Sequence, residues 1–177
     1  MVNFARLSVL VLAACGLSAC QTAMEQPTQS AGTAELKARD GSPAGMARLY
    51  DDGSAITVSV ALQGMTPGVH AVHLHTTGNC SAADFTSAGG HLNPGAKQHG
   101  SLNPAGSHLG DLPNVTVDAD GMGTASVTLS PPAAQALAEI FDADGTAVVV
   151  HEGADDYRSD PAGAAGSRVA CGVMSRS

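Results

Sequence analysis

The sequence predicts an all-β domain, folded as an antiparallel β-sandwich or barrel. Short segments rich in β-branched residues recur along the chain, and in several of them apolar and polar residues alternate with the two-residue period of a strand. Turn-forming residues are frequent, with 21 Gly and 9 Pro, which favours many short strands over long helices. In chain order, strands are expected at residues 46–50, 55–62, 69–75, 114–119, 123–130, 146–152 and 168–174.

The segments between these strands carry turn signals and two long loops. Three Asp-Gly pairs suit tight hairpin turns, because Gly accepts the positive φ that such turns require. The pairs lie at 52–53, 120–121 and 144–145. Residues 131–140 have helical propensity, and their two prolines fit either a helix start or a crossover between strands. Residues 76–113 and 152–167 are long enough to be predicted as functional loops.

The first residues resemble an export signal. Arg6 precedes an apolar run that ends in small residues and Cys20, the pattern of a secretory signal peptide at residues 1–19. The run is shorter than the roughly 20 apolar residues needed to span a bilayer. The motif LSAC, which ends at Cys20, resembles a bacterial lipobox, so Cys20 is expected to become the lipidated first residue. The motif LAAC, which ends at Cys15, is the alternative processing site.

The polar, aperiodic residues that follow suit a flexible tether, so residues 20–33 are expected to be the lipidated cysteine and its linker. The domain is then expected at residues 34–177. If Cys15 is removed and Cys20 is lipidated, Cys80 and Cys171 are the two cysteines left to form a disulfide. Two buried free thiols are the alternative, which an oxidising compartment disfavours.

The charge of the chain argues against nucleic acid as a partner. The net charge is −8, and removal of residues 1–19 takes away only Arg6, which leaves seven basic against 16 acidic residues and a net charge of −9. Nucleic-acid-binding domains carry basic patches that attract phosphate, and none is evident in the sequence.

All seven histidines lie between residues 70 and 151, which suggests a metal centre. His73 and His75 are two residues apart, so on a strand they share one face. Surface or hydrogen-bonded histidines are the alternative for such a pair. Three more imidazoles and a carboxylate follow in the first predicted loop, a suitable tetrahedral set for zinc. They are His91, His99, His108 and Asp111. A strand would bring His151 beside the His73/His75 face, and a nitrogen-rich site of this kind suits copper.

Six motifs together resemble the bacterial secreted copper/zinc superoxide dismutases, in order and in spacing, over residues 34–177. The motifs are GVHAVHLH at 68–75, GGHLNP at 89–94, KQHG at 97–100, HLGDLPNV at 108–115, VVHEGADD at 149–156 and GSRVACGV at 166–173. The resemblance implies an eight-stranded antiparallel Greek-key β-sandwich or barrel. It also implies an oxidoreductase that converts superoxide to dioxygen and hydrogen peroxide by alternating reduction and oxidation of copper.

Site residues follow from the same resemblance. It implies one copper ion held by His73, His75, His91 and His151, and one zinc ion held by His91, His99, His108 and Asp111. His91 would therefore bridge the two metals and, with Arg168, serve catalysis: His91 stores a proton and Arg168 binds the anion. Asp155 would link ligands of the two sites by hydrogen bonds, and His70 is expected to be a structural hydrogen-bonding residue.

The second predicted loop departs from the family pattern. It lacks the lysine and glutamate pattern of eukaryotic members, and Ala162 stands where those members have a threonine that lines the channel. Arg158 is the basic residue available within residues 152–167. A non-catalytic copper/zinc-binding periplasmic lipoprotein is therefore kept as the alternative function, although the chain retains His151 and Arg168, of which non-catalytic relatives usually lack one. A purely structural role for the histidines is a third possibility.

Partners and location complete these expectations. Superoxide is the expected substrate, a lipid anchor is expected to hold the protein to a membrane on the periplasmic side of a bacterial envelope, and a homodimer is possible. Gln21 follows the predicted lipidated cysteine where inner-membrane lipoproteins typically have aspartate, which favours the outer membrane.

Overall fold

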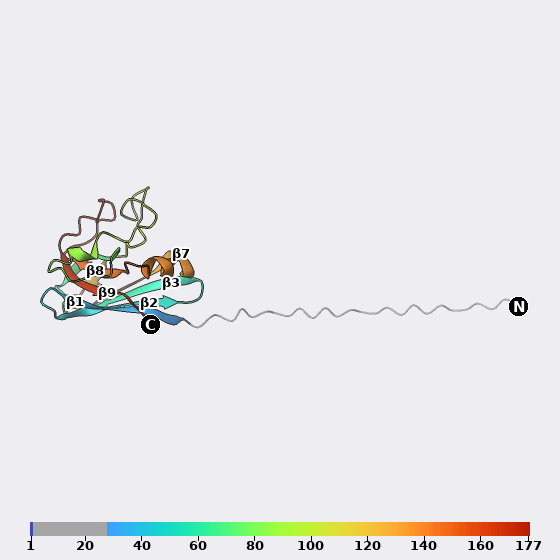
Figure 1. Cartoon of the computed structure of the whole chain (residues 1–177), viewed down its shortest axis with the longest axis horizontal. Helices are drawn as coiled ribbons and strands as arrows, with labels where there is room; N and C mark the ends of the chain where they lie inside the picture. Colours follow the sequence, from blue (N-terminus) through green and yellow to red (C-terminus); the bar gives the residue numbers. More distant parts are fainter. Residues whose placement is uncertain (2–27) are drawn as a thin grey trace.

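The structure is a computed structural model that describes Met1 and residues 28–177 (Figure 1). The predicted signal peptide, Cys15 and Cys20 lie outside the described residues. The elements are β1 Gln29–Ala38, β2 Pro43–Asp51, β3 Ala55–Leu62, β4 Gly68–His70, β5 Val72–His75, the 3-10 helix η1 Thr86–Ala88, β6 Val115–Val117, β7 Gly123–Pro132, α1 Ala133–Ile140, β8 Ala147–His151, β9 Arg168–Val173 and β10 Ser175–Arg176.

The strands form one curled antiparallel sheet and one small two-stranded sheet. Along the large sheet the order is β5-β8-β9-β1-β2-β3-β7, and β10 also pairs with β1. β4 pairs with β6 in the second sheet. The order β9-β1 brings the two ends of the domain together, as Figure 1 shows. The prediction of an antiparallel all-β fold with eight strands in its main sheet is confirmed.

Besides shifts at strand ends, two features differ from the sequence prediction. β1 was not among the predicted strands, and its start occupies residues predicted as the end of the tether. This part of β1 lacks an apolar alternating pattern because its residues are small or polar, and its backbone pairs with β2. The segment predicted as one strand at 69–75 is two strands, β4 and β5. The break falls at Ala71, whose N–H donates to the carbonyl oxygen of Gly153 at 2.8 Å.

The predicted turn glycines all have positive φ, but only one lies in a hairpin between paired strands. Gly53, Gly121 and Gly145 have φ of 86°, 77° and 65°. Gly53 lies between β2 and β3, which pair. Gly121 lies between β6 and β7, which pair with β4 and β3 instead. Gly145 lies between the helix α1 and β8. The segment 131–140, predicted as a helix start or a crossover, contains the end of β7 followed by the short helix α1.

Aliphatic side chains from the strands and from α1 form the hydrophobic core. In β3 every second residue is buried, and these residues are Ile56, Val58, Val60 and Leu62. Burying each such side chain contributes about 1.5–3 kcal/mol relative to leaving it exposed. Leu36, Leu49, Leu74 and Ile140 join them from β1, β2, β5 and α1 in one core cluster. This core supports β5 and β8, the strands that end in histidine.

Two long loops project from the same side of the sheet in Figure 1. The first long loop, residues 76–114, connects β5 to β6, and the second long loop, residues 152–167, connects β8 to β9. Cys80 and Cys171 form the predicted disulfide, with an S–S distance of 2.02 Å, and this bond ties the first long loop to β9. Within the described residues, no helix has the length and apolar character needed to cross a membrane.

Candidate metal centre

Strands β5 and β8 place three histidines together. His73 and His75 are fully buried on β5, and their ring nitrogens reach the same group, as the i, i+2 spacing predicted. β8 pairs with β5, and the N–H of His151 donates to the carbonyl oxygen of Ala71 at 2.9 Å. Neighbouring strands in a sheet are about 4.8 Å apart, so this pairing brings His151 beside the β5 histidines.

The first long loop returns to β5 at two points. One bridge pairs His75 with His91, and another pairs His73 with Asp111. Gly110 makes the second approach possible, because a Cβ atom at this position would lie 2.3 Å from the carbonyl oxygen of Leu74. The loop therefore places His91 and Asp111 directly against β5, the strand that carries His73 and His75.

Among the described residues, three groups of possible metal ligands result, and two of them share His91. The third, His73, His99 and Asp155, connects these two. The four-histidine group is His73, His75, His91 and His151; the Asp111 group is His91, His99, His108 and Asp111. Within each group the candidate ligand atoms lie within 4.8 Å of one another. The four-histidine group and the Asp111 group are the two sets that the sequence predicted.

The four-histidine group presents one nitrogen from each ring without a hydrogen-bond partner. The buried, unpaired atoms are Nδ1 of His73 and Nε2 of His75, His91 and His151. Hydrogen bonds occupy the opposite nitrogens: Nδ1 of His75 donates to the carbonyl oxygen of Gly89 at 2.9 Å, and Nδ1 of His151 donates to that of Gly166 at 3.2 Å. Because the proton of a neutral imidazole is used in such a bond, the unpaired nitrogen is left with its lone pair. Four converging lone pairs fit a metal ion that prefers nitrogen, such as copper.

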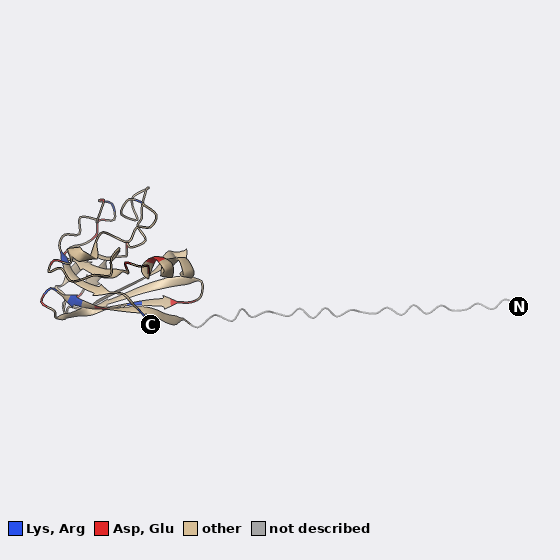
Figure 2. Cartoon of the chain, viewed as in Figure 1, with Lys and Arg blue, Asp and Glu red and all other residues tan. Residues whose placement is uncertain are grey.

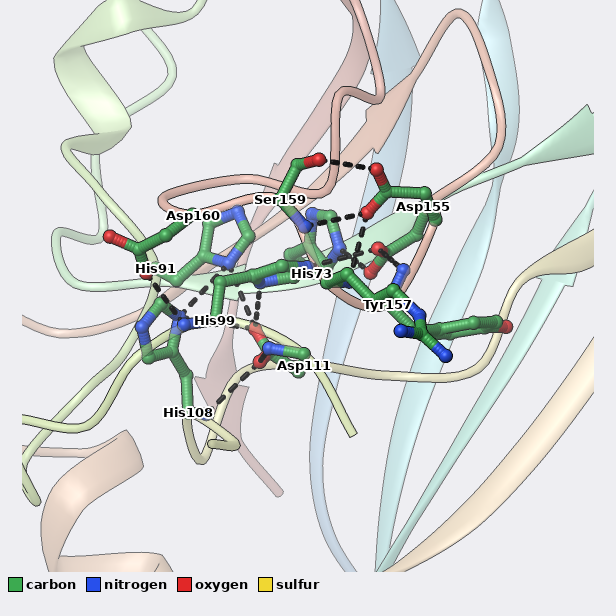
Figure 3. Close-up of polar contacts among 12 residues, drawn as sticks. His73, His91, His99, His108, Asp111, Asp155, Tyr157, Ser159 and Asp160 are labelled. Atoms are coloured by element: carbon green, nitrogen blue, oxygen red, sulfur yellow. Dashed lines mark hydrogen bonds and ion pairs between the residues drawn. The ribbon is translucent and has the colours of Figure 1, made fainter. Parts of the chain in front are cut away.

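In the Asp111 group, three ring nitrogens converge on one carboxylate oxygen (Figure 3). Oδ1 of Asp111 lies 2.9 Å from Nδ1 of His91, 3.0 Å from Nδ1 of His99 and 3.2 Å from Nδ1 of His108. The other carboxylate oxygen accepts hydrogen bonds from the backbone N–H groups of Gly100 and His108, at 2.9 and 3.0 Å. Three imidazoles and one fixed carboxylate are a suitable tetrahedral set for zinc.

Asp155 joins the two groups. Its Oδ2 accepts a hydrogen bond from Nε2 of His73, and its Oδ1 accepts one from Nε2 of His99, both at 2.9 Å (Figure 3). Each bond fixes the ring so that the other nitrogen, Nδ1, faces its own group. The exposed neighbour Asp156 bonds instead to Arg158 and Ser159 within the second long loop.

Burial keeps three of these imidazoles neutral. Burial lowers the pKa of His75 to about 2, and it lowers the pKa values of His91 and His151 to about 4. Burial also opposes ionisation of Asp111, but hydrogen bonds from His91 and from the Gly100 N–H hold the pKa of this carboxyl well below its usual range. Neutral rings and an ionised carboxylate are the forms that bind metals.

His99 and His70 have different surroundings. Burial opposes protonation of His99, yet its bonds to Asp155 and the nearby charge of Asp111 raise its pKa. The ring nitrogens of His70 contact the carbonyl oxygens of His151, at 2.7 Å, and of Thr66, at 2.8 Å. These backbone contacts agree with the structural role expected for His70.

Arg168 lines a cavity that is also lined by histidines of the four-histidine group. Its guanidinium donates to the carbonyl oxygens of Phe85 and Gly89, both at 2.7 Å. The cavity has a volume of about 320 Å³. Its lining includes His75, His91, His151, Arg168, Ala162 and Lys97. Lys97 was not singled out from the sequence, although it begins the motif KQHG that contains His99. The exposed Arg158 is not part of this lining.

The remaining basic residues are few and scattered, as Figure 2 shows. Arg168 and Lys97 are the cations that line the cavity described above, and Asp160 lines it as well. Asp160 also accepts the backbone N–H of His99 at 2.6 Å. Two cations and one carboxylate therefore line this cavity together with His75, His91 and His151.

Comparison with known proteins identifies the family. A family model described as copper/zinc superoxide dismutase matches residues 43–174. The Cu-Zn superoxide dismutase of Caulobacter vibrioides is 42% identical over 166 residues, which are 92% of this chain and 95% of the relative. The crystal structure of a SOD-like protein from Bacillus subtilis is similar with a TM-score of 0.72 and 34% identity, and it covers 82% of this chain and 99% of its own. The Cu/Zn superoxide dismutase of Brucella abortus gives a TM-score of 0.61 and 28% identity, with the same coverage. Together with the two ligand groups that share His91, these matches show that the chain belongs to the bacterial copper/zinc superoxide dismutases and is a superoxide dismutase that uses copper and zinc.

Proposed function

We propose that the four-histidine group binds copper, that the Asp111 group binds zinc, and that His91 bridges the two ions. The observation that carries this assignment is the set of four buried ring nitrogens without partners, all within one group. His91 supports the bridge because its Nε2 belongs to this set while its Nδ1 lies 2.9 Å from Asp111. With these ligand roles the chain would bind copper and zinc, the two metals named in the description of its family.

Copper, when bound, supplies the one-electron steps by which two superoxide ions become dioxygen and hydrogen peroxide, whereas zinc has no redox step of its own. The residues of the chain orient the reaction and handle its protons. Nε2 of His91 is placed to take up a proton and to return it, with water, to the product. Arg168 attracts the anion, since its guanidinium is fixed at the cavity wall by the carbonyl oxygens of Phe85 and Gly89. Asp155 holds His73 and His99 in the required tautomers.

Metal content of two single variants tests the assignment. His75 belongs only to the four-histidine group, and His108 belongs only to the Asp111 group. Purified wild type loaded with both metals is expected to hold one copper and one zinc per chain. His75→Ala is expected to lose copper and keep zinc, and His108→Ala is expected to show the reverse at limiting metal concentration. Equal loss of both metals in each variant, or loss of neither, would contradict the assignment.

We further propose that the protein is exported and anchored by lipid at Cys20, on the periplasmic side of the outer membrane. The signal pattern, the lipobox-like motif and Gln21 support this proposal. The tether would then run from Cys20 to the start of β1 at Gln29. The mass of the mature N-terminal peptide identifies the processed cysteine, and Cys20→Ser is expected to abolish membrane attachment. Recovery of the wild type in the inner-membrane fraction would contradict the proposed location. The homodimer stays a prediction, which sedimentation equilibrium of the soluble domain measures.

A further inference from the structure

We propose that Tyr157 is a positioning residue that holds the second long loop against the first and thereby sets the affinity of the Asp111 group for zinc. The inference rests on the zinc assignment proposed above. Tyr157 lies two residues after Asp155 and is half-buried between the loops. Figure 3 shows it beside Asp155 and near the ligands of the Asp111 group.

The backbone of Tyr157 has an unusual conformation that its contacts maintain. Its φ is 60°, in the left-handed region that a bulky residue rarely adopts. Its N–H donates to Oδ1 of Asp155 at 2.6 Å, and its carbonyl oxygen accepts the N–H of Leu102 at 3.1 Å. One peptide segment of the second long loop thus contacts both the carboxylate that orients His99 and the backbone of the first long loop. Strained backbone of this kind persists only where the surrounding structure fixes it, and it is concentrated at functional sites.

The phenol hydroxyl extends this contact through Asn114. It accepts the backbone N–H of Asn114 at 2.9 Å. The side-chain amide of Asn114 then makes two reciprocal bonds to the backbone of Asp155: Nδ2 donates to its carbonyl oxygen, and Oδ1 accepts its N–H, both at 2.9 Å. The hydroxyl of Tyr157 therefore holds Asn114 in place, and Asn114 holds the main chain of Asp155. A displacement here would move the carboxylate that bonds His73 and His99.

A second connection runs from Tyr157 to Asp111. The carbonyl oxygen of Tyr157 packs against Gly100, where a Cβ atom would lie only 2.1 Å away, and the φ of Gly100 is 97°. The N–H of Gly100 in turn donates to Oδ2 of Asp111. Tyr157 thus supports two ligands of the Asp111 group by separate routes, His99 through Asp155 and Asp111 through Gly100. Loss of a partner that orients a metal ligand typically weakens metal binding by about 10- to 100-fold.

Zinc affinity of Tyr157→Phe tests the inference, with Tyr50→Phe as the matched control. The first variant removes only the hydroxyl that accepts from Asn114. Tyr50 is the other tyrosine of the chain and lies on β2, where it pairs with Ser30 and Thr57. Competition with a chelator is expected to show about tenfold weaker zinc binding for Tyr157→Phe and an unchanged affinity for Tyr50→Phe. The visible spectrum of Co²⁺ bound in place of zinc is expected to change in the first variant alone.

Two additional measurements separate positioning from general stabilisation. Asn114→Ala is expected to weaken zinc binding in the same direction, and the double variant is expected to lose less than the sum of the two effects, because both changes act through Asp155. Thermal unfolding of the metal-free proteins is measured in parallel. A lower unfolding temperature for Tyr157→Phe with unchanged zinc affinity and an unchanged Co²⁺ spectrum would overturn the inference. Failure of the wild type to bind zinc at all would instead overturn the zinc assignment on which it rests.

Discussion

At the scale of single residues, the site depends on which nitrogen of each imidazole is already used in a hydrogen bond. Nε2 of His73 bonds to Asp155 and Nδ1 of His75 bonds to Gly89, so opposite ring atoms of the two residues face the same group. Backbone carbonyls and one buried carboxylate therefore choose the tautomers. Rings that are held in the required tautomer need less reorganisation when a metal binds.

Asp155→Asn is expected to weaken zinc binding by about 10- to 100-fold, because an amide cannot accept from both His73 and His99. Its NH₂ group would face the N–H of one ring, and that ring would lose its preferred tautomer. Asp156→Asn serves as the control, since the Asp156 carboxylate bonds to Arg158 and Ser159 rather than to a histidine. Chelator competition measures both affinities. Equal effects of the two substitutions would mean that Asp155 has no special role in orienting the ligands.

Metal-free protein is expected to lose stability as the pH falls from about 6.5 toward 4. The folded pKa values of His75, His91 and His151 are below the unfolded value of 6.5, at about 2, 4 and 4. In this range the unfolded chain binds protons that the folded chain does not, so the free energy of unfolding rises with pH. Each ring contributes on the order of 1 kcal/mol per pH unit. The raised pKa of His99 has its effect above pH 6.5, where its contribution to stability is lost as the pH rises.

Urea unfolding of the metal-free protein at pH 7, 6 and 5 measures this dependence. Protein loaded with both metals is the comparison, because bound metal keeps the rings deprotonated and is expected to reduce the loss. Stability that is equal or greater at pH 5 than at pH 7 in the metal-free form would contradict the assignment of these three rings as buried and neutral.

The ligand residues could be predicted from the sequence, but most of their surroundings could not. His73 and His75 follow from a local two-residue period, and the residue types in the first predicted loop and the strand that ends at His151 pointed to the remaining ligands. The resemblance of short motifs added the bridging role of His91 and the link through Asp155. Tyr157 and Asn114 were missed because they act through backbone atoms of the opposite loop, and no local pattern reports such a contact. Lys97 was missed because its position on the cavity wall depends on the path of the whole first long loop.

At the scale of elements, the two long loops and the disulfide form one unit around the site. Cys80 begins the part of the first long loop that carries the carbonyls of Phe85 and Gly89, which hold Arg168. Arg168 is the first residue of β9, the strand that also carries Cys171. The disulfide therefore fixes the acceptors of the arginine relative to the strand on which the arginine lies.

Removal of this disulfide is expected to lower stability and to slow turnover. The double variant Cys80→Ser/Cys171→Ser avoids a free thiol. The bond joins residues 91 positions apart, for which the chain-entropy model gives a loss of about 4–5 kcal/mol in the free energy of unfolding. Urea unfolding measures the stability, and the rate per bound copper measures the effect on Arg168. An unchanged free energy of unfolding would show that other contacts already fix the loop.

Most elements were predictable because strand alternation is a local signal. β3 follows the predicted bounds, 55–62, and β7, β8 and β9 differ from the predicted strands only near their ends. β1 was not predicted as a strand, since the small and polar residues at its start resemble a tether. The break at Ala71 was not predicted either, because it results from a bond to Gly153 in the second long loop.

At the scale of the whole molecule, an acidic protein must attract an anion. The net charge is −8 for the full chain and becomes −9 without residues 1–19, so the average field repels superoxide. The cavity offsets this locally, since two cations, Arg168 and Lys97, line it with one carboxylate, Asp160. Of these two cations, Lys97 belongs to the first long loop, and the second long loop contributes no cation to the lining.

Arg168→Ala is expected to slow superoxide removal by about tenfold at low salt and to flatten its dependence on ionic strength. Lys97→Ala is expected to have a smaller effect in the same direction, because Lys97 is exposed and more strongly screened. Arg158→Ala is the control, since Arg158 is exposed and does not line the cavity. Rates at several salt concentrations measure the slopes. If Arg158→Ala had the effect of Arg168→Ala, net charge rather than a local field would control the encounter.

The most direct test of the central claim is the rate of superoxide loss per bound copper, measured on residues 21–177 loaded with copper and zinc. We expect a rate that requires copper, falls when His91 is replaced, and approaches the diffusion limit known for this enzyme family. Full occupancy of both sites with negligible turnover would contradict this expectation. That result would support a non-catalytic copper- and zinc-binding lipoprotein instead.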